Sequence, residues 1–437
     1  MTTSTPVHVG PEDEGARPLQ PARLESREER THRLSVGVLV VVVGLVLAVL
    51  TFSTSGTARF ALSNVFDEVQ LPTFGLPGVP VVVLCALACL LAGAGFLVGR
   101  LSSRVRALAG TVAGVAFVLG FLTWAAAGRD LPFPVSNQFS GTLTLATPLV
   151  LGALCGVLCE RAGVVNVSIE GQFLTAAFTS AVVGSITDSI PLALLAAVVG
   201  GVFMATLLAL FAIRYKVDQV VLGVVLNLLA VGLTGFLFDQ LVQPNSSDLN
   251  SAPLLTPIPL PGLSAIPFFG PVLFQQNALA YLAIASVVLV WFLLFRTSWG
   301  LRVRSVGEHP EAADTVGISV RGIRWSAVLV GGVFGGLGGA FFSLAATGSF
   351  TKEMTVGNGF IALAALIMGR WHPVWATLMA LFFGFVTQMA SQLQTLSTPM
   401  PSQFLLLFPY VATIIAVAGL IGRVRAPAAD GVPYDKP

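Results

Sequence analysis

Long apolar runs, separated by short polar connections, occupy most of this chain. A helix needs about 20 apolar residues to cross a bilayer core about 30 Å thick. By that measure the runs predict twelve membrane segments, at residues 34–54, 78–99, 108–127, 142–159, 171–186, 191–213, 217–242, 278–295, 325–347, 359–369, 374–391 and 404–421. The pattern therefore predicts an all-α, polytopic helical membrane protein with about 10–12 membrane segments.

Composition and the polar ends complete the predicted domain organisation. Hydrophobic residues make up 55% of the 437 residues and charged residues only 10%, whereas a soluble domain carries about 25% charge. Residues 1–33 are rich in Pro, Glu, Arg and Thr, which predicts a disordered cytoplasmic tail. The chain then divides into N-terminal transmembrane spans at 34–127, a membrane core at 142–423 and a cytoplasmic tail at 424–437.

Basic residues are distributed unevenly between the two sides of the predicted layout. With the N-terminus in the cytoplasm, 20 of the 23 Lys and Arg residues fall inside, and only Arg59, Arg129 and Lys352 fall outside. Cytoplasmic loops carry such an excess, so both termini are predicted to be cytoplasmic. The outside loop 243–276 has seven prolines and no Lys or Arg. We expect it to be stiff and extended. It would either cap the outer mouth or contact an external partner, or it would be a passive linker.

Two predicted segments are too short to cross a bilayer. Residues 171–184 and 359–369 correspond to helices of about 21 Å and about 16 Å. Each follows a polar, glycine-containing lead-in, at 160–170 on the cytoplasmic side and at 348–358 on the outer side. Short segments entered from opposite sides are typical of inverted repeats with broken helices around a central site.

Polar side chains gather in and near the first of these breaks. Asn166, Ser168, Glu170 and Gln172 lie between two apolar runs. Such groups are costly in lipid, and an intramembrane carboxylate is a functional candidate. We predict that these four residues line a substrate pathway. Two alternatives stay open: Glu170 is exposed to water in a cytoplasmic loop, or it caps the helix that begins at Gly171 without contacting cargo.

The largest inside loop, 296–324, contains the pattern of a short helix lying outside the bilayer at 308–318. Pro310 suits its first turn, Glu311 its positive end, and Gly317 its termination. The small Ala312 and Ala313 would let it sit in a protein groove, and Glu308 would add negative charge beside Glu311. The alternative is a solvated linker.

The glycine-rich run 331–339 contains three overlapping GxxxG pairs, which indicate close packing between membrane helices. It is not a phosphate-binding loop, which requires GxxxxGK[ST] after a strand. The chain has only three lysines, Lys216, Lys352 and Lys436, and none lies in that context. The four cysteines are spaced as two i, i+4 pairs rather than as metal ligands, so no metal site is predicted.

The residues from Leu145 to Gly171 resemble the signature of bacterial ABC-importer permeases for nucleosides, within a superfamily that also holds branched-chain amino-acid and ribose permeases. The matching positions are Glu160, Arg161, Gly163, Asn166, Glu170, Gly171 and Asn227. The resemblance implies that Asn227 also lines the pathway. The loop 307–318 resembles the coupling loop of ABC importers. The resemblance covers about residues 142–423. It is less close at Ser168 and Gln172, where other members often have glycine and an apolar residue, and in the three additional N-terminal spans.

The resemblance implies a permease subunit that does no covalent chemistry and holds no cofactor, with ATP bound by partner subunits. It implies a second permease chain, two ATPase subunits, an extracytoplasmic substrate-binding lipoprotein, a small-molecule cargo and no nucleic acid. The permease would lie in the bacterial cytoplasmic membrane. The contact with the ATPase would be made by Glu308, Glu311, Ala312, Ala313 and Gly317. The alternatives are a permease of the same superfamily for a sugar or a branched-chain amino acid, and an ion-driven secondary transporter.

Overall fold

The computed structural model describes residues 27–64, 69–99, 102–396 and 425–436, with isolated positions at 403, 404, 407, 410 and 411. Most of the predicted N-terminal tail and almost all of the predicted span at 404–421 lie outside the described residues. Within the described part, nine helices are long and apolar enough to cross a membrane. The prediction of an all-α, polytopic membrane protein is therefore confirmed.

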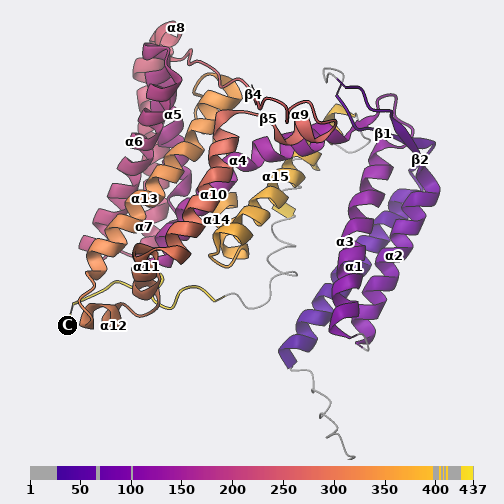
Figure 1. The fold of residues 1–437 in the computed structure, drawn as a ribbon, viewed down its shortest axis with the longest axis horizontal. Helices are drawn as coiled ribbons and strands as arrows, with labels where there is room; N and C mark the ends of the chain where they lie inside the picture. Colours follow the sequence, from indigo (N-terminus) through magenta and orange to yellow (C-terminus); the bar gives the residue numbers. More distant parts are fainter. Residues whose placement is uncertain are drawn as a thin grey trace, which may run out of the picture.

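Three helices form an N-terminal bundle that lies beside the rest of the molecule (Figure 1). They are α1 (Arg27–Thr51), α2 (Gly78–Val98) and α3 (Ser103–Ala126). A Cβ at Gly44 of α1 would lie 2.9 Å from Leu90 of α2, and a Cβ at Gly93 of α2 would lie 2.6 Å from Val41 of α1. The two glycines thus allow α1 and α2 to pack closely.

A small sheet connects this bundle to the core at one end of the molecule. It contains β1 (Thr57–Ala61), β2 (Phe74–Pro77) and β3 (Phe133–Pro134) in the order β2-β1-β3, with β1 antiparallel to β2 and parallel to β3. Phe60 and Trp124 share a buried cluster with Met389 and Leu393 of the core. The N-terminal bundle is therefore packed onto the core at this end.

The core follows from α4 onward. Its membrane helices are α4 (Val135–Arg161), α5 (Ile169–Thr187), α6 (Ile190–Ala209, continued by Leu210–Arg214), α7 (Gln219–Leu237, continued by Phe238–Val242), α10 (Ala278–Arg296), α13 (Val320–Ala340, continued by Phe341–Thr347), α14 (Asn358–Met368) and α15 (Pro373–Thr395). α4 lies at the centre, with every residue from Ala146 to Glu160 buried.

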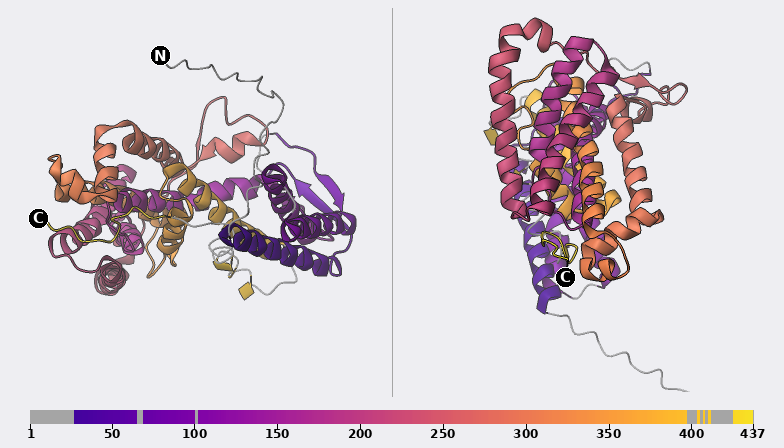
Figure 2. Two further views of the ribbon diagram at one scale, coloured as in Figure 1. Left: turned by 90° about the horizontal axis from the view of Figure 1, so that it is seen from below. Right: turned by 90° about the vertical axis from the view of Figure 1, so that its left-hand side faces the viewer.

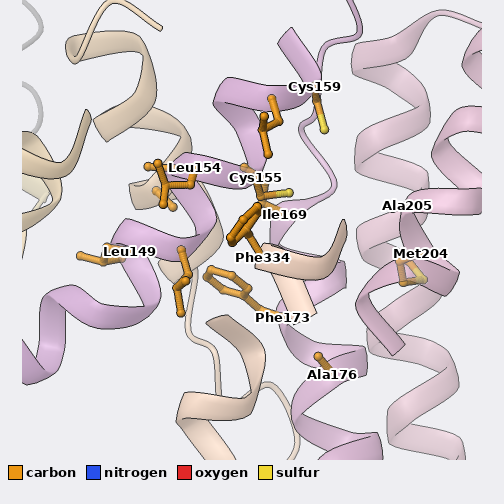
Figure 3. Close-up of a cluster of buried hydrophobic side chains, with 14 of the residues drawn as sticks. Leu149, Leu154, Cys155, Cys159, Ile169, Phe173, Ala176, Met204, Ala205 and Phe334 are labelled. Atoms are coloured by element: carbon orange, nitrogen blue, oxygen red, sulfur yellow. The ribbon is translucent and has the colours of Figure 1, made fainter. Parts of the chain in front are cut away.

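The glycine-rich run of α13 packs as the sequence predicts. A Cβ at Gly201 of α6 would lie 2.4 Å from the backbone of Gly336 and 2.5 Å from that of Gly332. On another side, a Cβ at Gly339 would lie 2.4 Å from the carbonyl oxygen of Phe173 in α5. α13 is therefore in backbone contact with both α5 and α6. Figure 3 shows Phe173 among the buried apolar side chains of α4, α5 and α13.

The two large connections lie at opposite ends of the core helices (Figure 1). One end carries α11 (Ser298–Glu308) and α12 (Pro310–Thr315). The other carries a 3₁₀ turn (Gln243–Asn245), α8 (Ser246–Leu249), β4 (Ile258–Pro259), α9 (Phe269–Leu273) and β5 (Gln275–Gln276). The proline-rich loop is thus not wholly extended, because two short helices form where prolines are sparse or fall inside a single turn.

The structure corrects the length of the first short segment. α5 has 19 residues and spans about 28 Å, because it begins at Ile169 and continues to Thr187. α14 has 11 residues, as predicted, and spans about 16 Å. The chain before α5 nevertheless breaks the helical path, since residues 162–168 are not helical.

Candidate functional site

The break between α4 and α5 is a turn followed by a segment that runs back along α4. Gly163 takes φ +83°, a left-handed conformation that glycine adopts without strain. Asn166 then donates from Nδ2 to the sulfurs of Cys155 and Cys159, at 3.3 and 3.5 Å. Its Oδ1 accepts from the backbone N and the Oγ of Ser168, at 3.2 and 2.8 Å. These bonds satisfy polar groups that would otherwise be buried without partners.

α7 holds the other side of the same segment. Asn227 accepts from the backbone N of Gly171 at 2.8 Å and donates to the carbonyl oxygen of Val167 at 3.0 Å. One residue of this contact was missed by the sequence reasoning: Gln219, whose Oε1 accepts from the backbone N of Val165 at 2.7 Å. Gln219 and Asn227 are eight residues apart and so share a helix face. That spacing of two amides in an apolar helix is a signal that could have identified Gln219.

Glu170 connects this break to the second one. Its Oε1 accepts from Thr355 Oγ1 at 2.5 Å and from the backbone N of Gly357 at 2.8 Å, and its Oε2 accepts from the backbone N of Gly359 at 2.6 Å. Gly357 is the N-cap of α14, and Gly359 is its second residue. The first N–H groups of a helix lack intrahelical partners and carry partial positive charge. The carboxylate in the first turn of α5 therefore caps α14.

The close approach of these two helix ends depends on Gly359. A Cβ there would lie 2.4 Å from the backbone N of Glu170 and 2.5 Å from its Cα. The N-termini of α5 and α14 thus meet at one buried carboxylate, which is only 9% exposed. One predicted alternative was a cap on the helix that begins at Gly171. The observed hydrogen bonds are of the capping type, but they are made to α14.

Gln172 faces away from α14, between α4 and α13. Its Oε1 accepts from Cys155 Sγ at 3.1 Å, and a Cβ at Gly335 of α13 would lie 2.3 Å from this Oε1. Its Nε2 is buried and has no hydrogen-bond partner among the described residues. Gln172 therefore retains an unused donor in the interior.

The structure brings all five predicted pathway residues together around the break. Each is buried within this chain: Asn166, Ser168 and Gln172 are fully inaccessible, and Glu170 and Asn227 are nearly so. The hydrogen bonds described above join them to other groups of this chain. Their contact with a cargo stays a prediction.

The predicted coupling helix is two helices rather than one. His309 takes φ −142° and ψ 81°, so α11 ends at Glu308 and α12 begins at Pro310. The residue before a proline is disfavoured in the α conformation, which accounts for the break. Glu311 lies in the first turn of α12, and Gly317 takes φ +83° after its end, as predicted.

The faces of α12 differ in exposure. Ala313 is 4% exposed, whereas Ala312, Glu308 and Glu311 are exposed. Only one of the two alanines thus lies on a surface open to a partner. Because Glu308 belongs to α11, it does not share a helix face with Glu311 in the way the sequence predicts.

Comparison with known proteins identifies the core. A family model described as the permease component of a branched-chain amino acid transport system matches residues 138–419. The chain belongs to this permease family. The match begins three residues into α4, so the permease core carries both breaks and the loop with α11 and α12, and the N-terminal bundle lies outside it.

Individual relatives agree with this assignment. The permease is 43% identical over 304 residues to the guanosine ABC transporter permease protein NupQ of Bacillus subtilis, covering 68% of this chain and 95% of the relative. It is 42% identical over 306 residues to the nucleoside ABC transporter permease protein NupC of Lactococcus lactis, covering 67% and 95%. It is 34% identical over 311 residues to the putative glucose ABC transporter permease protein TsgC13 of Haloferax volcanii, covering 67% and 93%. No solved structure matches.

Proposed function

We propose that this permease forms one half of the translocation pathway of an ABC importer that moves nucleosides across the bacterial cytoplasmic membrane. The observation that carries the proposal is the meeting of two broken-helix N-termini, those of α5 and α14, at Glu170. Broken helices whose ends converge inside the membrane are the usual framework of a central transport site. The high identity to relatives named for guanosine and nucleosides supports the cargo.

The partners follow from the same proposal. A second permease chain supplies the other half of the pathway, two ATPase subunits bind ATP and dock on the loop with α11 and α12, and an extracytoplasmic lipoprotein delivers the nucleoside. The permease itself holds no cofactor. Both termini lie in the cytoplasm, and the loop with α8 and α9 lies outside. The excess of basic residues on the side of α11 and α12 supports this orientation.

Within the pathway we assign the five polar residues different tasks. Asn166, Ser168, Glu170 and Asn227 hold the break in shape, and cargo meets this wall when the two permease halves move apart. Gln172 is the residue with a donor left over, at Nε2. A buried amide without a partner costs free energy, and a hydroxyl or base edge of a nucleoside would remove that cost.

The first test is transport by the complete complex in proteoliposomes. ATP-dependent uptake of guanosine is expected, competed by other nucleosides and unaffected by a proton ionophore. Replacement of ATP by a non-hydrolysable analogue is the control, and it should abolish uptake. A second candidate, import of a sugar, is favoured by the identity to TsgC13. Uptake of glucose or leucine in place of guanosine would overturn the nucleoside assignment.

The role of Gln172 is tested by a change of similar volume. Gln172→Met removes the amide, and the guanosine concentration for half-maximal uptake should rise about fivefold, the loss expected for one hydrogen bond of about 1 kcal/mol. Gln388→Met is the matched control, because Gln388 lies in α15, away from the break, and makes one long bond to the carbonyl oxygen of Asn137 at 3.4 Å. Equal effects of the two changes would remove Gln172 from the pathway.

A further inference from the structure

The last described segment, residues 425–436, crosses the end of the molecule that carries α11 and α12 (Figure 1 and the right-hand view of Figure 2). We call it the C-terminal strap. Its first part lies between α11 and the α4–α5 turn. Ala429 donates from its backbone N to the carbonyl oxygen of Gly307 at 2.9 Å. A Cβ at Gly163 would lie 2.8 Å from the carbonyl oxygen of Ala429. The strap thus contacts both connections through backbone atoms, which cannot move aside by a change of rotamer as a side chain can.

A buried arginine depends on the strap for its hydrogen bonds. Arg324, in the first turns of α13, is 2% exposed. Its guanidinium donates to the carbonyl oxygen of Val432 at 2.9 Å and to that of Ala429 at 3.5 Å. A buried cation without such partners is strongly unfavourable. Seating of the strap therefore satisfies a charge that belongs to the permease core.

The last part of the strap supports the inner face of α12. Tyr434 is 7% exposed and packs with Val306, Ala313 and Val320. Lys436 lies 3.8 Å from the carboxylate of Asp314 in α12. On the other side, Asp435 pairs with Lys216 in the α6–α7 connection. The strap therefore joins three connections of the permease core at this end: α4–α5, α6–α7, and the loop with α11 and α12.

The outer face of α12 is left open by this arrangement. Glu311 and Ala312 are exposed, and Val316 is 74% exposed. A partner that docks on this face would press α12 against Tyr434. Well-packed contacts have low compressibility, so the load would pass through the strap to the Gly163 turn and to the segment that leads into Glu170.

We infer that the C-terminal strap is a positioning element for ATPase coupling: it backs α12 against the ATPase and stays seated throughout the transport cycle. This inference rests on the proposed function, because it requires an ATPase on the outer face of α12. The strap is thus part of the surface that converts ATPase movement into movement of the α4–α5 break, rather than a tail that competes with the ATPase for α12.

The first experiment removes the anchor. In proteoliposomes of the complete complex, Tyr434→Ala should lower the nucleoside transported per ATP hydrolysed about tenfold, which corresponds to about 1.4 kcal/mol of lost contact. Tyr434→Phe should restore coupling, because the ring supplies the packing against Val306, Ala313 and Val320. Val432→Ala is the matched control: its side chain is 51% exposed, and its carbonyl oxygen remains available to Arg324.

The outcomes separate the inference from the proposed function. If the wild-type chain neither co-purifies with an ATPase nor shows ATP-dependent transport, the proposed function fails. If the wild type is coupled and Tyr434→Ala has the same ratio of transport to hydrolysis, the strap has no positioning role and the inference is overturned.

A reversible lock tests whether the strap stays seated. Asp314→Cys and Lys436→Cys are joined by a short bis-methanethiosulfonate reagent. The four native cysteines are buried in helices and leave the new pair as the accessible thiols of this chain. The locked complex should transport at the rate of the unlinked double variant. Loss of transport on locking, with recovery after reduction, would mean that the strap must leave α12 and would overturn the inference.

Discussion

Glu170→Gln isolates the contribution of the carboxylate that joins α5 to α14. The side chain keeps its shape, but one oxygen becomes an NH2 group. If the amide nitrogen takes the place of Oε2, the NH2 group faces the backbone N of Gly359. If the amide is flipped and the nitrogen takes the place of Oε1, the NH2 group faces the backbone N of Gly357. Two donors then oppose each other in either case, so at least one N–H at the start of α14 loses its acceptor.

The cost follows from the bonds that are lost. A buried donor without a partner costs about 1–3 kcal/mol, and removal of a negative charge from a helix N-terminus adds about 0.3–1 kcal/mol. We therefore expect the start of α14 to be destabilised by about 1.3–4 kcal/mol, which corresponds to an opening equilibrium about 10-fold to about 1,000-fold more favourable at the amides of Gly357 and Gly359.

Hydrogen exchange of the purified complex in detergent measures this opening directly. The peptide that contains Gly357 and Gly359 should lose protection, while peptides from α1–α3 should exchange as in the wild type. Glu353→Gln makes the same chemical change at an exposed position of the same connection and is the control. Wild-type protection in Glu170→Gln, or equal effects of the two changes, would refute the capping role of Glu170.

Three further predictions concern the orientation, the coupling loop and the strap. Ser247→Cys places a thiol in the exposed α8; it should react with an impermeant reagent on whole cells, and reaction only after lysis would reverse the topology at that loop. Gly317→Val forces a β-branched residue into φ +83°, at a cost of about 1–2 kcal/mol, and should weaken ATPase co-purification. Gly317→Asn should not, because asparagine tolerates this conformation. Equal co-purification of the two variants would show that the turn is not part of the ATPase contact. Burial raises the pKa of Asp430 from 3.8 to about 7, against the opposing effect of Arg324, with Glu160 also nearby. Because the seated strap favours the protonated acid, the stabilisation of the strap by Asp430 is complete below the unperturbed pKa and is lost as the pH rises through about 7. Proteolysis at the strap should therefore increase with pH more steeply in the wild type than in Asp430→Asn.

The membrane architecture was accessible from the sequence because the bilayer imposes a strong length rule. The apolar runs located the helices, and the glycine run of α13 indicated its close packing. The break at Asn166–Glu170 was also visible, since polar side chains interrupt an apolar pattern there. The length of α5 was not, because its first residues, Ile169 and Glu170, belong to the polar lead-in by composition and to the helix by conformation.

The partners of the polar residues were beyond sequence reasoning. Glu170 and Gly359 are 189 residues apart, and nothing in either local pattern indicates that they meet. The same holds for Arg324 and Val432, which are 108 residues apart. The alternative in which Glu170 caps the helix beginning at Gly171 named the wrong helix for this reason: a carboxylate in the first turn of α5 fits the dipole of α5 equally well, and only the tertiary contact distinguishes the two.

The strap and the breaks are connected through close backbone contacts, which pass a displacement from one element to the next. A Cβ at Gly307 would lie 2.1 Å from the carbonyl oxygen of Arg161, so the end of α11 touches the end of α4 backbone to backbone. From Arg161 only the Gly163 turn and five residues separate this contact from Ile169, where α5 begins, and Asn166 and Asn227 hold that path. Side chains that can change rotamer absorb a displacement, whereas backbone contacts do not. A displacement of α11 is therefore passed to α4 and α5, and through Glu170 to α14. The two helices that meet at the carboxylate would then move as one unit, which is the discrete rearrangement that alternating access requires.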